Sequence, residues 1–195
     1  MKHFLGIEDE EFIRGKAPMT KKEIRILTLA GAKIGKADIV CDIGAGTGSL
    51  SIEAALLARE GHVYAVERKT EAAALIRQNA EKFGVENLTI IENEAPKGLE
   101  QLPERIDAAI IGGTGSHLEK ILDFLDARLK PDGFIVINCI TVQTLARSLA
   151  YMRKKSGYLY DTVQVQVNRL RKIGPYDMAE AINPVYIISC HKANV

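Results

Sequence analysis

The sequence has almost no excess of charge and few aromatic residues: 26 lysines and arginines balance 25 aspartates and glutamates, and tryptophan is absent. A net charge of +1 excludes the global positive field with which many proteins bind nucleic acid without sequence specificity. The three cysteines are odd in number and form no CxxC pair, which excludes a disulfide framework and a cysteine zinc site. We therefore expect reduced thiols, no metal site and a cytoplasmic protein.

Long apolar runs are also missing. None approaches the roughly 18 residues that cross a bilayer, and the first residues lack the apolar core of a signal peptide, so we expect neither export nor membrane insertion. The 195 residues suffice for a single domain over 1–195 that buries roughly 70% of its unfolded surface. Residues 1–20 are expected to form an N-terminal arm because Pro18 disfavours helix. Thr20 and Glu23 make a capping box that predicts where the first helix begins.

Short apolar runs alternate with segments of helical periodicity along most of the chain. Repeated strand and helix units joined by short turns predict an α/β fold, with a mostly parallel sheet covered by helices on both faces. The alternation breaks at the end, where two strand-like segments flank a loop expected over 168–184, and we expect these two strands to pair antiparallel. The predicted strands are 38–43, 62–67, 88–91, 106–111, 134–140, 160–167 and 185–190. The predicted helices are 21–34, 49–59, 70–83, 96–101, 117–129 and 142–155.

The strongest indication of a binding site is the sequence DIGAGTG over 42–48, which connects the first predicted buried strand to the helix that follows it. Alternate glycines permit tight turning and close approach of a ligand, and the free N–H groups of the helix start face that ligand. In open α/β sheets ligands bind at the carboxyl ends of strands beside the topological switch point, where this loop is expected. Glu67 ends the next strand, where a carboxylate can accept both hydroxyls of a ribose. The pattern predicts an adenosine-type ligand.

The glycine spacing argues against a nicotinamide dinucleotide. A G-x-G-x-x-G/A fingerprint would place its third member at Ser49, whereas the glycine is Gly48. An acid followed by G-x-G-x-G, with a second acid ending the next strand, resembles the class I S-adenosylmethionine-dependent methyltransferases. That resemblance implies a Rossmann-like three-layer sandwich whose seven-stranded, mostly parallel sheet has an antiparallel terminal strand. Amino-directed DNA methyltransferases carry N-P-P-Y after the fourth strand; here GGTGSH stands there, and NPVY over 183–186 is interpreted as a turn.

Several stretches outside the glycine loop point to a narrower family. RGKAPMTKKEIR over 14–25, IGG over 111–113, RLRKIG over 169–174 and NPVY over 183–186 together resemble the decarboxylating cobalt-precorrin-6B C15-methyltransferases, or precorrin-8w decarboxylases, of anaerobic cobalamin biosynthesis. The resemblance covers nearly the whole chain. It implies that S-adenosylmethionine methylates C15 of cobalt-precorrin-6B or precorrin-6B, leaving S-adenosylhomocysteine, and that the C12 acetate is decarboxylated. It also implies a homo-oligomer, a tetramer.

The resemblance assigns roles to residues. Glu67 would hold the ribose, Glu94 and Ala95 would lie near the adenine, and Thr20 would reach the cofactor from the arm. The cofactor-binding set is Thr20, Asp42, Gly44, Ala45, Gly46, Thr47, Gly48, Glu67, Glu94, Ala95 and Gly112. Because the substrate is a polycarboxylate, arginine forks suit it, and Gly113 leaves room for its bulk. The substrate-binding set is Arg14, Lys16, Gly113, Arg169 and Arg171.

No catalytic residue is assigned. A sulfonium methyl is already electrophilic and a reduced tetrapyrrole is a carbon nucleophile, so the protein mainly has to align the two. One alternative is a class I methyltransferase acting on RNA, in which the same basic segments would contact phosphates; the low net charge and 6% aromatic content disfavour it. Another is a binding protein on the same fold without catalysis, which the complete cofactor loop disfavours. We expect a tetrapyrrole partner and neither nucleic acid nor membrane.

Overall fold

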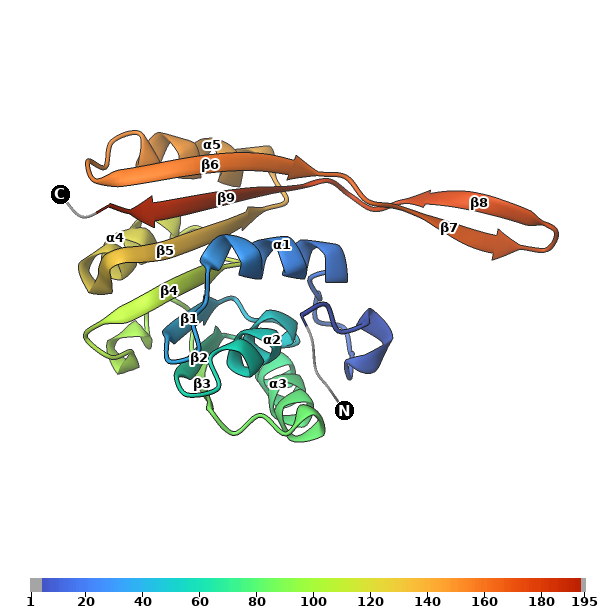
Figure 1. The fold of residues 1–195 in the computed structure, drawn as a ribbon, viewed down its shortest axis with the longest axis horizontal. Helices are drawn as coiled ribbons and strands as arrows, with labels where there is room; N and C mark the ends of the chain where they lie inside the picture. The colour runs from blue at the N-terminus through green and yellow to red at the C-terminus, as the bar shows by residue number, and fades with distance from the viewer. Residues whose placement is uncertain (1–4, 194–195) are drawn as a thin grey trace.

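A seven-stranded sheet in the order β3-β2-β1-β4-β5-β9-β6 forms the centre of the computed structural model, which describes residues 5–193 (Figure 1). Strand β9 runs antiparallel to both of its neighbours, β5 and β6, whereas the other neighbouring strands are parallel. The sheet strands are β1 Ile39–Ile43, β2 His62–Glu67, β3 Leu88–Glu92, β4 Ile106–Ile111, β5 Leu129–Cys139, β6 Tyr158–Val165 and β9 Val185–Lys192. The predicted α/β class, mostly parallel sheet and antiparallel terminal strand are confirmed.

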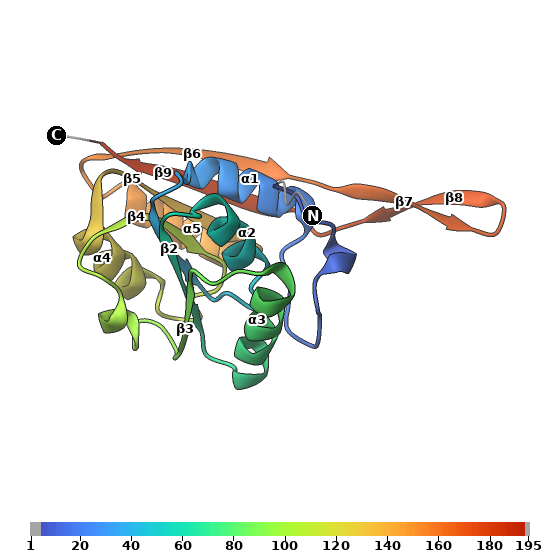
Figure 2. The same cartoon turned by 60° about the horizontal axis from the view of Figure 1, so that its bottom comes forward.

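Helices cover both faces of this sheet, with α1, α2 and α3 on one face and α4 and α5 on the other (Figures 1 and 2). Successive residues of β5 point to opposite faces, so Val136 belongs to the hydrophobic cluster under α1 to α3 and Ile137 to the cluster under α4 and α5. Because both faces are buried, the central strands are continuous apolar runs. Within residues 5–193 no helix has the length and apolar character needed to cross a membrane. The helices are α1 Lys22–Ala32, α2 Ser49–Leu57, α3 Thr70–Phe83, α4 Leu118–Arg128 and α5 Val142–Met152.

The N-cap residue predicted for α1, Thr20, is wrong. The residue preceding the helix is Lys21, whose side chain makes no capping bond, and the N–H of Lys22 donates to Asp9 of the arm at 3.0 Å. A carboxylate from another segment therefore accepts an N–H group of the first turn, and the helix begins without a side-chain cap from its own segment. The helix expected over 96–101 is likewise reduced to a 3₁₀ turn over Leu99–Gln101. Strands β2 and β4 and helix α3, in contrast, have the predicted bounds.

The loop expected over 168–184 is instead largely a β-hairpin. Its strands, β7 Asn168–Ile173 and β8 Tyr176–Ala181, pair antiparallel with each other and form a separate two-stranded sheet. The hairpin projects from the body of the molecule (Figures 1 and 2), and all of its strand residues except Arg169 are exposed. Because neither face is buried, the sequence lacks the alternation of apolar and polar residues by which a strand is identified.

Candidate cofactor and substrate site

A cavity of about 490 Å³ lies at the carboxyl ends of β1, β2, β4 and β5, beside the segment 17–21 of the N-terminal arm. This is the edge at which open parallel sheets bind ligands, and it is where the sequence placed the site. Nine residues of the two predicted sets line the cavity together: Thr20, Gly44, Ala45, Gly46, Glu67, Glu94, Ala95, Gly112 and Gly113.

The glycine loop packs backbone against backbone on both sides. Gly44 has φ +75°, and a Cβ there would lie 2.7 Å from the backbone N and O of Gly113 at the end of β4. Gly46 has φ +59°, and its Cβ would lie 2.7 Å from the carbonyl oxygen of Pro18 in the arm. Side chains are excluded at both positions by conformation and by space. The loop therefore touches β4 and the arm directly, which forms a narrow cradle of backbone groups.

Glu67 is 8% exposed and holds the loop in place. Its Oε2 accepts the N–H of Gly46 and its Oε1 accepts the N–H of Lys69, both at 2.9 Å. A carboxylate offers about four acceptor positions, so two remain for the hydroxyls of a ribose. This geometry fits the predicted role of Glu67.

Asp42 lies beneath the loop rather than in the cavity lining. It is 1% exposed, and the hydroxyl of Ser51 donates to its Oδ2 at 2.5 Å. Burial raises the pKa of Asp42 to about 6 against the lowering effect of the Ser51 bond, and the nearby Glu67 carboxylate raises it further. The charged form of Asp42 therefore costs stability at neutral pH.

Removing the Asp42 carboxyl is expected to change the free energy of unfolding by an amount that depends on pH. Between its ordinary value of 3.8 and its folded value of about 6, the folded chain binds the Asp42 proton more tightly than the unfolded chain, so this contribution to stability falls as pH rises. The Asp42→Asn variant cannot titrate there. We expect its unfolding free energy relative to the parent to rise across this window and to level off above it. Urea unfolding of both proteins at several pH values measures the difference between their unfolding free energies. A difference that does not change with pH would contradict the raised pKa of Asp42.

Two further predicted cofactor residues support the loop from outside the cavity. Thr47 is fully buried, and its carbonyl accepts the Asn79 amide at 3.0 Å; Gly48, at φ +79°, precedes the first residue of α2. Direct contact of Asp42, Thr47 and Gly48 with a cofactor stays a prediction.

The two residues predicted to lie near the adenine are at the other end of the site. Glu94 pairs with Arg68 at 2.8 Å, and Ala95 is buried.

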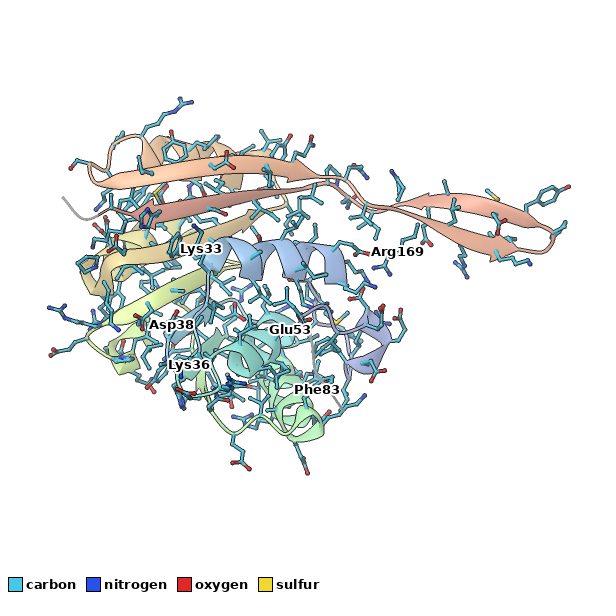
Figure 3. The ribbon with its side chains drawn as sticks, in the orientation of Figure 1. Lys33, Lys36, Asp38, Glu53, Phe83 and Arg169 are labelled. Atoms are coloured by element: carbon cyan, nitrogen blue, oxygen red, sulfur yellow. The ribbon has the colours of Figure 1, made fainter. Side chains whose placement is uncertain are left out.

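The predicted basic substrate residues lie outside the cavity lining. Arg169 sits where the hairpin leaves the body, beside α1 (Figure 3), and donates to both carboxylate oxygens of Glu23 at 2.9 and 3.0 Å. Arg171 is exposed on β7, and Arg14 and Lys16 are exposed on the arm. Their contact with a substrate stays a prediction.

Sequence reasoning missed cavity residues supplied by distant segments. Ile24 comes from α1, Asn138 and Ile140 from β5 and the residue just after it, and Asn183 and Val185 from the entry into β9. Asn138 had a detectable signal, because it is the one amide within the apolar run Phe134 to Ile140. The others carry no signal of their own. Ile24 is an ordinary buried residue of α1, Ile140 and Val185 are exposed and half-buried apolar residues of a common kind, and Asn183 belongs to the segment interpreted as a turn.

The residues present fit S-adenosylmethionine. The cradle between Gly44 and Gly46 admits close backbone approach, and Glu67 keeps free acceptor positions at the adenosine side. Above Gly113 the space is open, since no described atom lies within 4 Å of a Cβ placed there. A methyl donor in the cradle would therefore face an unfilled volume at the end of β4.

Comparison with known proteins agrees with this arrangement. Residues 11–192 match the family model described as a precorrin methyltransferase domain. The chain is 40% identical over 185 residues to the probable cobalt-precorrin-6B C(15)-methyltransferase (decarboxylating) of Sulfolobus acidocaldarius, covering 94% of this chain and 95% of that protein. The structure of precorrin-6y C5,15-methyltransferase from Geobacter metallireducens superposes with a TM-score of 0.90 at 40% identity, covering 96% of this chain and 97% of that one. Precorrin 8w decarboxylase from Methanobacterium thermoautotrophicum superposes with a TM-score of 0.88 at 33% identity, covering 97% and 100%. The chain belongs to the precorrin methyltransferase family.

Proposed function

We propose that this protein methylates C15 of cobalt-precorrin-6B, or of precorrin-6B, and decarboxylates the C12 acetate side chain, as a step of anaerobic cobalamin biosynthesis. The observation that carries the proposal is the placement of the cofactor cradle next to the open space above Gly113 in a chain that matches decarboxylating C15-methyltransferases along 94% of its length. Family membership supports this reading over an RNA methyltransferase, and over a binding protein without catalysis.

We infer that the cofactor is S-adenosylmethionine, which supplies an electrophilic methyl group when bound. The loop over 44–46 would hold its methionine and ribose portions, Glu67 its ribose hydroxyls, and Glu94 and Ala95 its adenine. The arm segment 17–21 would close the site from one side and exclude water from the reacting atoms. The chain's contribution to methyl transfer is alignment of the two reactants.

Arginine and lysine side chains near the cavity would bind the peripheral carboxylates of the tetrapyrrole. Arg14 and Lys16 lie on the arm that precedes α1, and Arg169 and Arg171 lie on β7, where Arg169 pairs with Glu23 in the first turn of α1. Arg169 would exchange part of its pairing with Glu23 for a substrate carboxylate. Such forked contacts suit a polycarboxylate.

The proposed partner is the tetrapyrrole rather than nucleic acid or membrane, and the proposed location is the cytoplasm. The net charge of +1 supports a partner other than nucleic acid. A cytoplasmic location is supported by three free and buried cysteines, Cys41, Cys139 and Cys190.

Mass spectrometry of the pigment tests the reaction. The protein is incubated with S-adenosylmethionine and enzymatically generated cobalt-precorrin-6B, with the metal-free analogue in parallel. The expected product is one methylene heavier and one carbon dioxide lighter. Methyl gain without loss of carbon dioxide would remove the decarboxylation from this chain, and an unchanged pigment would contradict the proposal.

Replacing Glu67 with glutamine is expected to weaken S-adenosylmethionine binding by about tenfold or more, because a charged acceptor of two ribose hydroxyls is lost. Isothermal titration calorimetry measures the dissociation constant. Glu92→Gln is the matched control, because Glu92 ends the neighbouring strand, pairs with Arg77 and does not line the cavity. An affinity that is equal in both variants would remove Glu67 from the ribose site.

We also propose that the chain assembles as a homotetramer through the β7–β8 hairpin. A two-stranded hairpin is marginally stable by itself in water. This hairpin nevertheless exposes large apolar side chains: Leu170 is 75% exposed, Tyr176 71% and Met178 53%. Burial against further copies of the chain would stabilise it.

Replacing Leu170 with aspartate is therefore expected to shift the assembly toward smaller species, because a carboxylate would have to be buried in the contact. Size-exclusion chromatography with light scattering gives the mass. Val142→Asp is the control, since Val142 is also 70% exposed but lies on α5 outside the hairpin. A parent protein that is already monomeric, or a Leu170 variant of unchanged mass, would contradict the role of the hairpin.

A further inference from the structure

Asn138 is a buried amide with an unused donor. It lies on β5, one residue beyond the Ile137 that pairs with Ile111, and so stands beside Gly112 at the end of β4. Its side chain shares the sheet face of Val136, where an apolar residue would continue the hydrophobic cluster. It is 9% exposed, lines the cavity, and its Nδ2 has no hydrogen-bond partner among the described residues. An unpaired buried donor costs stability, which points to a ligand that completes it.

The amide is held in one orientation by α1. The fully buried Thr28 hydroxyl donates its single proton to Oδ1 of Asn138 at 3.0 Å. The carbonyl oxygen of Ile24, 2.7 Å from the same hydroxyl, already accepts the Thr28 backbone N–H one turn along α1. Because Oδ1 is engaged with the helix, Nδ2 is the group left for the cavity. The donor is thus fixed before any ligand arrives.

The segments of the lining that adjoin this amide in the sheet contribute only uncharged residues. Among the described cavity residues, those from the end of β4 through Gly115, from the end of β5 and from the entry into β9 are all neutral. The charged members of the lining come from the arm and from the ends of β2 and β3: Lys21, Glu67, Arg68, Lys69 and Glu94. The cavity therefore has a charged cofactor side and a neutral side around Asn138, and the two sides meet where Gly115 lies beside the Glu94 carboxylate.

We propose that Asn138 binds the reacting acetate of the substrate, with its Nδ2 donating a hydrogen bond to the carboxylate that leaves as carbon dioxide. This inference rests on the proposed function and names the acetate subsite within it. A carboxylate that must lose its charge is served better by one neutral donor than by an arginine, which would stabilise the ionised ground state. The peripheral carboxylates that persist in the product are left to the basic residues of the arm and hairpin.

The reaction at this subsite balances with a proton from water. The bond between the acetate methylene and its carboxyl carbon breaks, and the electron pair passes into the conjugated macrocycle as carbon dioxide leaves. A proton then adds to the methylene, which becomes a methyl group. Asn138 orients the carboxylate during bond breaking and has no contact partner once carbon dioxide has left.

A comparison of substrate and product affinities tests this assignment, because the product lacks the carboxylate in question. Cobalt-precorrin-6B and the pigment isolated after complete turnover are each titrated into the protein by absorbance, in the presence of S-adenosylhomocysteine, which has no methyl to transfer. We expect Asn138→Leu to weaken substrate binding by about tenfold or more and to leave product binding unchanged. Thr28→Val, which frees the amide to rotate, should give a smaller effect in the same direction. Asn93→Leu removes an amide from the opposite end of the cavity and should alter both affinities by the same factor.

Equal weakening of substrate and product by Asn138→Leu, or no change in either, would overturn the assignment. A parent protein that binds neither pigment would instead overturn the proposed function, so the two failures are distinguishable. If Asn138→Leu no longer binds S-adenosylhomocysteine, its fold is disturbed, and Asn138→Ser is judged by the same ratio of affinities.

Discussion

Replacing Arg25 with methionine is expected to lower the free energy of unfolding by about 3–5 kcal/mol. Arg25 is fully buried between two buried carboxylates: its Nε donates to Glu53 and its Nη1 to Asp9, both at 2.8 Å. Among the described residues, removing the guanidinium leaves the buried Glu53 without an ion-pair partner, and it leaves Asp9 with only the longer ion pairs to Lys21 and Arg169 at 3.6 and 3.5 Å. Although burial raises the pKa of Asp9, the hydrogen bond and charge of Arg25 hold that pKa below its ordinary value, with help from Lys21 and Arg169.

The same residue fastens the arm over the site. Its Nη1 also donates to the carbonyl of Thr20 at 2.6 Å, and Glu53 accepts the N–H groups of Gly6 at 2.8 Å and Ile7 at 3.2 Å. In Figure 3 Glu53 lies directly beneath α1. We therefore expect Arg25→Met to weaken S-adenosylmethionine binding as well, because the arm residues that line the cavity lose their anchor.

Urea unfolding and calorimetry measure both effects of Arg25→Met. Arg77→Met is the control: it breaks an ion pair with Glu92 whose partners are 53% and 33% exposed, and such a pair contributes about 1 kcal/mol or less. If the two variants lose the same stability, the buried network does not hold the arm.

Replacing Gly44 with alanine is expected to cost about 2–5 kcal/mol of folding stability and to abolish measurable cofactor binding. The positive φ of +75° is strained for any residue with a Cβ, and that Cβ would lie 2.7 Å from backbone atoms of Gly113. Since backbone cannot rotate away as a side chain can, the loop or the end of β4 has to move. Thermal unfolding and calorimetric titration measure the two losses.

Gly113→Ala is the matched substitution on the other side of the same contact. A Cβ there meets no described atom within 4 Å, and Gly113 is not among the glycines with positive φ. We expect normal stability and normal S-adenosylmethionine affinity, but slower turnover of the tetrapyrrole, because the added methyl enters the space proposed for the substrate. Unimpaired turnover would show that the substrate does not use this space.

Much of the fold could be predicted because it is encoded by local periodicity. Helix α3 and strands β2 and β4 were predicted with their observed bounds, since each is buried on at least one face and therefore has a regular apolar pattern. The hairpin β7–β8 was predicted as a loop because it is exposed on both faces and has no such pattern. The cap of α1 was assigned to the wrong residue because Asp9, thirteen residues away from Lys22, accepts the N–H of Lys22, and no pattern of neighbouring residues indicates that contact.

By itself the sequence determined the glycine loop over 42–48, the acid at Glu67 that ends the next strand, and the alternation of strands and helices, because these depend on residues close together in the chain. The tertiary structure alone decided that the arm packs its Pro18 carbonyl against Gly46, that β9 lies between β5 and β6, and that Thr28 orients Asn138 across 110 residues. Packing decides such contacts between distant segments, and no local pattern carries them. The neutral half of the cavity arises in the same way, because the residues that form it come from separate parts of the chain and meet only in the folded protein.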